Sequence, residues 1–241
     1  MHEKETRREN KNGELYVVAT PIGNLEDISL RALRVLKKVD AILCEDTRVT
    51  GKLLAHFDIK KPLISYHARS SQHKEEEIIR KLREGKRYAL VSDAGTPAIS
   101  DPGSKLIDAI YRSEKAIRII PIPGPSAVIS ALSVSGFFGN QFTFYGFFPQ
   151  KKGRKKLLEE IFSSSRIAVF YESPHRILKL FEMIKEYFPE HYTTADIFIG
   201  RELTKMYEET VRGAISDVHD YFLSHSENIR GEFVIVIYPH L

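Results

Sequence analysis

Acidic and basic side chains occur together at three places in the sequence, each directly after a short apolar run. The segments are Glu45-Asp46-Thr47-Arg48, Tyr171-Glu172-Ser173-Pro174-His175-Arg176 and Arg201-Glu202-Leu203-Thr204-Lys205. A carboxylate in such a segment can accept a proton, and a cationic side chain can hold a phosphate. One such segment is usually a solvated ion-pair cluster. Three of them indicate a single polar site.

A second kind of segment is rich in glycine, proline and small side chains. Residues 92–103 read SDAGTPAISDPG, and shorter segments of this type lie at 20–24 and 123–127. Small residues let a backbone approach a ligand closely, and prolines fix the path of the chain. Residues 123–127 also open a predicted helix, whose free N–H groups favour carboxylates or phosphates. On composition alone, a ligand loop and a stiff connection explain residues 92–103 equally well.

A basic run follows two aromatic residues near the middle of the chain. Phe147 and Phe148 precede Lys151, Lys152, Arg154, Lys155 and Lys156. Cationic side chains neutralise phosphates, and aromatic rings can stack on bases. We expect the two phenylalanines to lie in the core and the basic run to contact RNA. The formal net charge of +4 is compatible with a polyanionic partner.

Alternating strands and helices must position these residues. Apolar runs predict strands at 15–20, 39–44, 60–67, 87–92, 116–122, 142–148, 166–171, 196–200 and 232–238. Helical spacing between them predicts an α/β fold. The alternation of strands and helices in the first half indicates a mostly parallel sheet, and ligands bind at the carboxyl ends of the strands of such a sheet. Three prolines and a glycine at 121–125 mark a domain boundary. We therefore expect a charged leader (1–13), an N-terminal α/β domain (14–122) and a C-terminal α/β domain (123–241), with a polar cleft between the two domains.

Several classes of protein do not fit the sequence. A G-x-x-x-x-G-K-[ST] phosphate loop is absent, and no full G-x-G-x-x-G follows the first predicted strand. Cys44 is the only cysteine, so disulfides and cysteine-based zinc sites within one chain are excluded. The histidines lack short ligand spacing, and we expect no metal. A lone cysteine, no long apolar run and no signal-like start favour a cytoplasmic protein without membrane contact.

Taken in order, the motifs resemble one family, the bacterial 16S rRNA (cytidine-2′-O)-methyltransferases of the tetrapyrrole methylase superfamily. The resemblance runs from about residue 13 to residue 238 and rests chiefly on SDAGTPAISDPG and YESPHR. It implies two α/β domains of the tetrapyrrole methylase type, S-adenosylmethionine in the cleft between them, and a homodimer. The chain departs from the family at Ser70-Ser71, where members often have an Asn-Glu pair.

The resemblance also implies roles for individual residues. The implied cofactor-binding residues are Pro21, Asp93, Gly95, Thr96, Pro97, Ile99, Ser126, Ala127, Tyr171, Glu172, Glu202 and Gly231. The expected reaction is attack of a cytidine 2′-hydroxyl in 16S rRNA on the methyl group, which needs a base but no metal. The candidate bases are Asp46, His67, Asp93, Glu172 and Glu202. The residues expected to contact RNA are Arg48, Lys151, Lys152, Arg154, Lys155, Lys156, Arg176 and Lys205.

Two other functions stay open at this point. A small-molecule methyltransferase acting on tetrapyrroles such as precorrins shares the superfamily fold, although the basic run and the charged segments speak against it. A non-catalytic RNA-binding protein of the ribosome is the second alternative, and a saturable S-adenosylmethionine site would exclude it.

Overall fold

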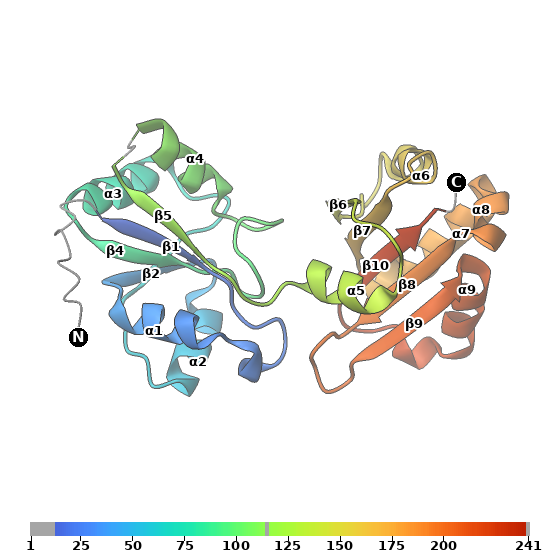
Figure 1. Cartoon of the computed structure of the whole chain (residues 1–241), viewed down its shortest axis with the longest axis horizontal. Coiled ribbons are helices and arrows are strands. Elements are labelled where there is room, and N and C mark those ends of the chain that lie inside the picture. The colour runs from blue at the N-terminus through green and yellow to red at the C-terminus, as the bar shows by residue number, and fades with distance from the viewer. Residues whose placement is uncertain (1–12, 114–115, 240–241) are drawn as a thin grey trace, which may run out of the picture. The chain divides into compact units, whose positions relative to one another are not determined.

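A computed structural model describes residues 13–113 and 116–239, and these divide into two compact units, one ending at Pro125 and the other beginning at Ser126 (Figure 1). The boundary predicted between residues 122 and 123 lies slightly earlier, in the same proline-rich segment. Residues 1–12 of the predicted leader lie outside the described residues. Gly13, also assigned to that leader, belongs to the first unit, where its N–H donates to the Leu82 carbonyl at 2.8 Å.

The first unit contains a fully parallel sheet with the strand order β3-β2-β4-β1-β5. The strands are β1 (Glu14–Val18), β2 (Ala41–Cys44), β3 (Leu63–Ser65), β4 (Arg87–Leu90) and β5 (Arg118–Ile122). Burial of apolar side chains on both faces explains why these runs read as continuously apolar rather than alternating. The predicted α/β class is confirmed for this unit.

Helices cover both faces of this sheet (Figure 1). The helices are α1 (Leu30–Lys38), α2 (Thr47–His56), α3 (Gln72–Arg83) and α4 (Ser104–Ser113), with the short 3-10 helix η1 at Leu25–Asp27. Leu36 of α1 and Leu54 of α2 pack with Ile42, whereas Leu82 of α3 and Leu106 of α4 pack with Leu43. Neighbouring residues of β2 thus point to opposite faces, as strand geometry requires.

The connections leaving β1 and β4 define where a ligand would bind. These two strands are neighbours in the sheet, yet β1 leads toward α1 on one face and β4 leads toward α4 on the other. In open α/β sheets, the crevice at the carboxyl ends of two strands that diverge in this way is the usual ligand site.

The second unit contains a mixed sheet with the order β6-β7-β10-β8-β9. The strands are β6 (Phe142–Phe147), β7 (Ile167–Glu172), β8 (Asp196–Arg201), β9 (Glu209–Ala214) and β10 (Phe233–Tyr238). Strands β6 and β7 are parallel, while β10 runs antiparallel to β7 and β8, and β9 runs antiparallel to β8. The carboxyl ends of β6, β7 and β8 therefore lie at one edge of the sheet, beside the start of β10.

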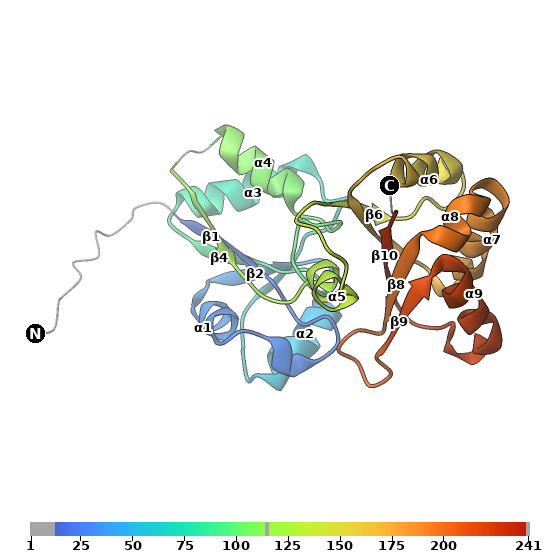
Figure 2. The ribbon, with the colours of Figure 1, turned by 45° about the vertical axis from the view of Figure 1, so that its right-hand side comes forward.

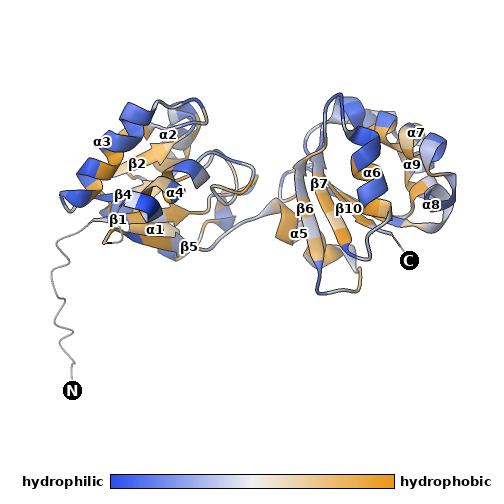
Figure 3. Cartoon of the chain, turned by 90° about the horizontal axis from the view of Figure 1, so that it is seen from above, coloured by the Kyte–Doolittle hydropathy of each residue, from blue (hydrophilic) through white to orange (hydrophobic). Residues whose placement is uncertain are grey.

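Helices also lie on both faces of the second sheet. They are α5 (Ala127–Ser135), α6 (Arg154–Phe162), α7 (Ile177–Tyr187), α8 (Pro189–Thr194) and α9 (Ile215–Ser224), with 3-10 helices η2 (Pro174–Arg176) and η3 (Ser226–Asn228). Leu158, Phe181 and Phe222 bring α6, α7 and α9 onto one face. Helix α5 lies on the other face, over β10 and β8 (Figure 2), and it is apolar along most of its length (Figure 3).

Among the residues that the structure describes, no helix combines the length and the apolar character needed to cross a membrane.

Candidate active site

Three loops of the first unit are fastened together at the carboxyl edge of its sheet. After β1, the Thr20 N–H donates to the Gly95 carbonyl at 2.9 Å, and the Gly95 N–H donates back to the Thr20 carbonyl at 3.0 Å. The Thr96 hydroxyl donates to the Pro125 carbonyl in the loop after β5 at 3.1 Å. The segments that the sequence marked at 20–24, 92–103 and 123–127 therefore approach one another here.

The backbone in these loops is unusually close-packed and partly strained. Gly95 has a φ of 80°, and Ala98 and Ser100, which are not glycines, have φ values of 68° and 62°. A Cβ on Gly124 would lie 3.0 Å from the Ala19 Cβ. Strain of this kind persists only where surrounding contacts enforce it, and it is concentrated at ligand sites.

The implied cofactor residues of this edge differ in exposure. Pro21, Gly95 and Pro97 are buried, Thr96 is half-buried, and Ile99 has 51% of its surface exposed. The buried residues shape the backbone of the loop, whereas Ile99 leaves an apolar side chain exposed at this edge. Asp93, also exposed, lies at the start of the same loop.

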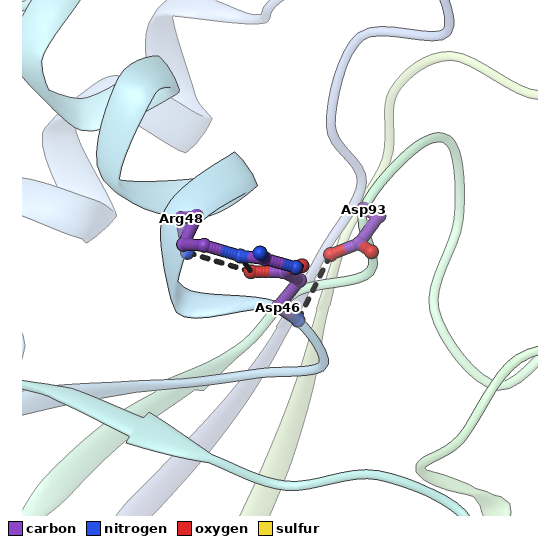
Figure 4. Close-up of polar contacts among 3 residues, drawn as sticks. All are labelled: Asp46, Arg48 and Asp93. Carbon is purple, nitrogen blue, oxygen red and sulfur yellow. Dashed lines mark hydrogen bonds and ion pairs between the residues drawn. The ribbon is translucent and has the colours of Figure 1, made fainter.

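The carboxylate of Asp46 holds the beginning of α2. It accepts a 2.8 Å hydrogen bond from the Arg48 backbone N–H, and its other oxygen lies 2.6 Å from Arg48 Nη2 (Figure 4). The Asp46 backbone N–H donates to Asp93 Oδ1 at 3.2 Å, which joins the ends of β2 and β4. The hydrogen bonds from the side chain and the backbone of Arg48 lower the pKa of Asp46 to about 2. Such a weak base is poorly suited to take a proton near neutral pH.

Asp101 is a carboxylate that the sequence reasoning missed. Burial, followed by the nearby charges of Glu45 and Asp93, raises the pKa of Asp101 to about 6. A carboxylate perturbed in this way at a ligand edge is a candidate for acid–base chemistry. The sequence held a signal for it, because Asp101 lies within the same glycine- and proline-rich loop as Asp93.

His67 follows β3, at the same edge of the sheet but on its outermost strand. The ring is exposed, and its Nδ1 accepts a 3.2 Å hydrogen bond from the Arg69 backbone N–H. The Ser70 hydroxyl accepts from the His67 backbone N–H at 3.0 Å. These contacts stabilise a local turn. Within the described residues no hydrogen bond joins His67 to the carboxylates discussed above.

At the corresponding edge of the second unit, Glu202 and Gly231 are packed against each other. Glu202 Oε1 lies 2.8 Å from Lys205 Nζ and accepts from the Glu232 backbone N–H at 2.9 Å. Burial alone would raise the pKa of Glu202, but the hydrogen bonds from Lys205 and Glu232 lower it. A Cβ on Gly231, whose φ is 84°, would lie 2.4 Å from Glu202 Cδ, so any other residue here would force the Glu202 side chain to move.

Glu172, at the end of β7, is shared by two arginines. Its side chain is fully buried; Oε1 accepts from Arg176 Nε at 2.7 Å, and Oε2 lies 3.7 Å from Arg154 Nη2. Arg154 is 5% exposed, and burial lowers the pKa of its guanidinium. Arg154 is expected from the sequence to contact RNA, but its side chain turns inward to the Glu172 carboxylate rather than to the surface.

The other members of the basic run are exposed, and so is one of the preceding aromatics. Lys151, Lys152, Lys155 and Lys156 all lie on the surface. Phe148 is buried as expected, but the expectation for Phe147 is wrong, because 66% of its surface is exposed. The register of β6 shifts between residues 144 and 147, where Gly146 has a φ of 68°. Such a bulge re-aims the following side chain.

The remaining implied cofactor residues occupy strand ends or helix starts. Ser126 precedes α5 without a side-chain capping hydrogen bond, and Ala127 is its first residue. Tyr171 is half-buried, and its ring contacts those of Phe144 and Phe147. Nowhere in residues 13–113 or 116–239 do three or more histidine, cysteine or acidic side chains gather as a metal site would require.

Comparisons with known proteins show which family this chain resembles in sequence and in fold. The family model described as Tetrapyrrole (Corrin/Porphyrin) Methylases matches residues 14–219. Among solved structures, uroporphyrin-III-C-methyltransferase from Thermus thermophilus superimposes with a TM-score of 0.61 at 20% identity, covering 94% of both chains. Diphthine synthase superimposes with a TM-score of 0.69 at 12% identity, over 94% of this chain and 89% of the other. At these identities the structures show the shared fold.

Curated relatives are much closer in sequence. Several of them are named ribosomal RNA small subunit methyltransferase I. The Thermotoga maritima protein is 45% identical, over 93% of this chain and 98% of the relative. The Escherichia coli O157:H7 protein is also 45% identical, over 96% of this chain and 80% of the relative. The Bacillus subtilis relative is 43% identical over 93% and 75%. The chain therefore belongs to the tetrapyrrole methylase family and, within it, to the small-subunit ribosomal RNA methyltransferases I. The resemblance found in the motifs is confirmed, and the protein is a methyltransferase.

Proposed function

We propose that this protein transfers a methyl group from S-adenosylmethionine to the 2′-hydroxyl of a cytidine in 16S rRNA of the small ribosomal subunit. The proposal rests on the hydrogen bonds that join the loops 20–24, 92–103 and 123–127. These loops meet at the carboxyl edge of the first sheet, where the connections after β1 and β4 diverge. The names of the relatives at 43–45% identity support the RNA substrate. We also propose a cytoplasmic homodimer, as the family resemblance implies.

The residues at this edge fit S-adenosylmethionine, which when bound supplies a methyl group on a positively charged sulfonium. The glycine and proline loop lets the backbone come close to a ligand. The charges of Glu45 and Asp93 lie close enough to raise the pKa of Asp101, and such an acidic edge favours a cationic ligand. In this proposal the cofactor is held by Pro21, Asp93, Gly95, Thr96, Pro97 and Ile99. The family resemblance adds Ser126, Ala127, Tyr171, Glu172, Glu202 and Gly231 from the second unit.

In the proposed mechanism, the carboxylate of Asp101 takes the proton of the ribose 2′-hydroxyl. A base with a pKa of about 6 is ionised near neutral pH and still has appreciable affinity for a proton. Asp46, with a pKa of about 2, acts instead as the cap that places α2 and Arg48. Glu172 and Glu202 are engaged in ion pairs and position the arginine and lysine side chains beside them.

Two other functions are less well supported. Tetrapyrrole methylation is the activity named for structural neighbours of low identity, such as the Thermus uroporphyrin-III-C-methyltransferase at 20%. A non-catalytic RNA-binding role does not fit a chain whose relatives are named methyltransferases.

Binding and transfer assays test the proposal against both alternatives. Calorimetry with S-adenosylmethionine is expected to give one saturable site per chain. Radiolabelled cofactor is then offered with small ribosomal subunits that lack the modification, or with uroporphyrinogen III. Label in RNA alone supports the proposal, label in the tetrapyrrole alone favours the first alternative, and saturable binding with no transfer to either contradicts the proposed substrate.

A further inference from the structure

An exposed aromatic ring stands at the carboxyl end of β6, beside the end of the parallel strand β7. The Phe147 ring is held 5.1 Å, centroid to centroid, from the ring of Tyr171 on β7. The bulge at Gly146 turns Phe147 outward, so 66% of its surface is exposed. A ring that is fixed in orientation and open to solvent can stack on a nucleobase.

The loop that follows this ring leads into a positively charged helix start. Lys151 and Lys152 are exposed, and Gly153 precedes α6 with a φ of 89° and no side-chain cap. The first turn of α6 contains no acidic residue. Its backbone N–H groups and the positive end of the helix dipole therefore favour an anion, with two lysine side chains beside them.

A buried cationic cluster lies directly behind this helix start. Arg154, the first residue of α6, and Arg176 share one carboxylate, that of Glu172, which leaves one positive charge in excess. Only 5% of the surface of Arg154 is exposed. None of its three guanidinium nitrogens makes a hydrogen bond within the described residues. Glu172 Oε2 is likewise without a hydrogen bond. The excess positive charge behind the start of α6 adds to the attraction of this helix start for an anion.

We propose that the ends of β6 and β7 form a subsite for one unpaired nucleotide of an RNA. The base stacks on Phe147, and the adjoining phosphate is held by Lys151, Lys152 and the N–H groups that begin α6. Arg176, whose side chain is 24% exposed, adds a second cationic contact, and Arg154 is a positioning residue that keeps the Glu172 carboxylate neutralised when Arg176 engages the phosphate. This inference rests on the proposed action on RNA.

The test measures RNA binding separately from methyl transfer. Fluorescence anisotropy with a labelled single-stranded oligocytidylate compares the full-length protein with Phe147→Leu and with the double variant Lys151→Gln/Lys152→Gln, over a range of salt concentrations. The matched controls are Phe142→Leu, an exposed aromatic at the other end of β6, and Lys179→Gln, an exposed lysine of α7. Methyl transfer by the wild-type protein to small ribosomal subunits is measured in parallel.

Phe147→Leu is expected to weaken binding by about fivefold or more, because stacking on one base is lost. The lysine double variant is expected to reduce the magnitude of the slope of log affinity against log salt by about 1.4, since two phosphate contacts are removed. Both controls should bind like the wild type. If both test variants also bind like the wild type while the wild type methylates subunits, the subsite is wrong and the proposed function stands. If the wild type neither binds nor methylates RNA, both are wrong.

Discussion

Arg176 Nε donates a 2.7 Å hydrogen bond to Oε1 of the fully buried Glu172, and Arg176 Nη2 lies 2.7 Å from the same oxygen. The second carboxylate oxygen faces Arg154 at 3.7 Å. Two guanidinium groups thus depend on one negative charge. Because the buried charges are unequal in number, removing different members of the cluster has different consequences.

Glu172→Gln is expected to destabilise the protein strongly. It leaves Arg154 buried without a counter-charge, and breaking a buried pair in this way costs about 3–5 kcal/mol. Arg154→Met fills a similar volume and leaves Glu172 paired with Arg176, so it is expected to change stability far less. Urea unfolding of the two variants and the wild type checks the contrast. Equal losses in both variants would contradict the charge balance described here.

Asp101→Asn is expected to lower kcat by about 10²–10⁴-fold while leaving S-adenosylmethionine affinity within a few-fold of the wild type, because a general base contributes on this scale. Asp108→Asn, on the exposed face of α4, is the matched control. A normal kcat in Asp101→Asn would exclude the residue as the base.

The pH profile of the wild type gives a second test of Asp101. The carboxyl group has its pKa raised to about 6, and only its ionised form accepts a proton. Activity at saturating cofactor should therefore be high above pH 6 and fall as the pH drops through about 6. A profile that stays flat down to pH 4.5, near the ordinary range of a carboxyl group (about 3.9 for Asp), would contradict the assignment.

His219 should make stability depend on pH. Its ring is buried, its Nδ1 lies 2.9 Å from the Tyr192 hydroxyl, and burial lowers its pKa. The folded state therefore favours the neutral ring, so this contribution is complete above the unfolded pKa of about 6.5 and is lost as the pH falls below it. His219→Gln should reduce the difference in unfolding free energy between pH 7.5 and pH 5. The ring of His225 is exposed, so the control variant His225→Gln should show the same difference in unfolding free energy as the wild type.

Gly231→Ala should be more damaging than Gly153→Ala. Both glycines have positive φ values, 84° and 89°, so each alanine costs about 1–2 kcal/mol through the backbone. A Cβ on Gly231 would also collide with Glu202, whereas one on Gly153 meets nothing within 4 Å. Chemical denaturation should show the additional loss at Gly231. Equal losses at the two positions would mean that Glu202 yields easily.

The sequence predicted the arrangement of the site better than the state of its side chains. Because the carboxyl ends of parallel strands share an edge, apolar runs alone were enough to bring residues 20–24 and 92–103 together. Helix α2 and strand β9 were not predicted, since few of their residues are fully buried and their apolar patterns are weak.

The charge state of a residue depends on neighbours from other segments, which no local pattern contains. Arg154 stands among lysines in the sequence, yet its burial is decided by Glu172 on the next strand. The raised pKa of Asp101 depends on Glu45, which follows a different strand. The apolar run predicts a core position for Phe147. The bulge that turns Phe147 outward interrupts the regular alternation of the strand, and the run does not show this bulge.

The most direct test identifies the methylated nucleoside. Small ribosomal subunits that lack 2′-O-methylation are incubated with the protein and S-adenosylmethionine carrying a labelled methyl group. The 16S rRNA is then digested to nucleosides and examined by mass spectrometry. Labelled 2′-O-methylcytidine is the predicted product. Label on a base, or no label in RNA although the cofactor binds, would contradict the proposed reaction.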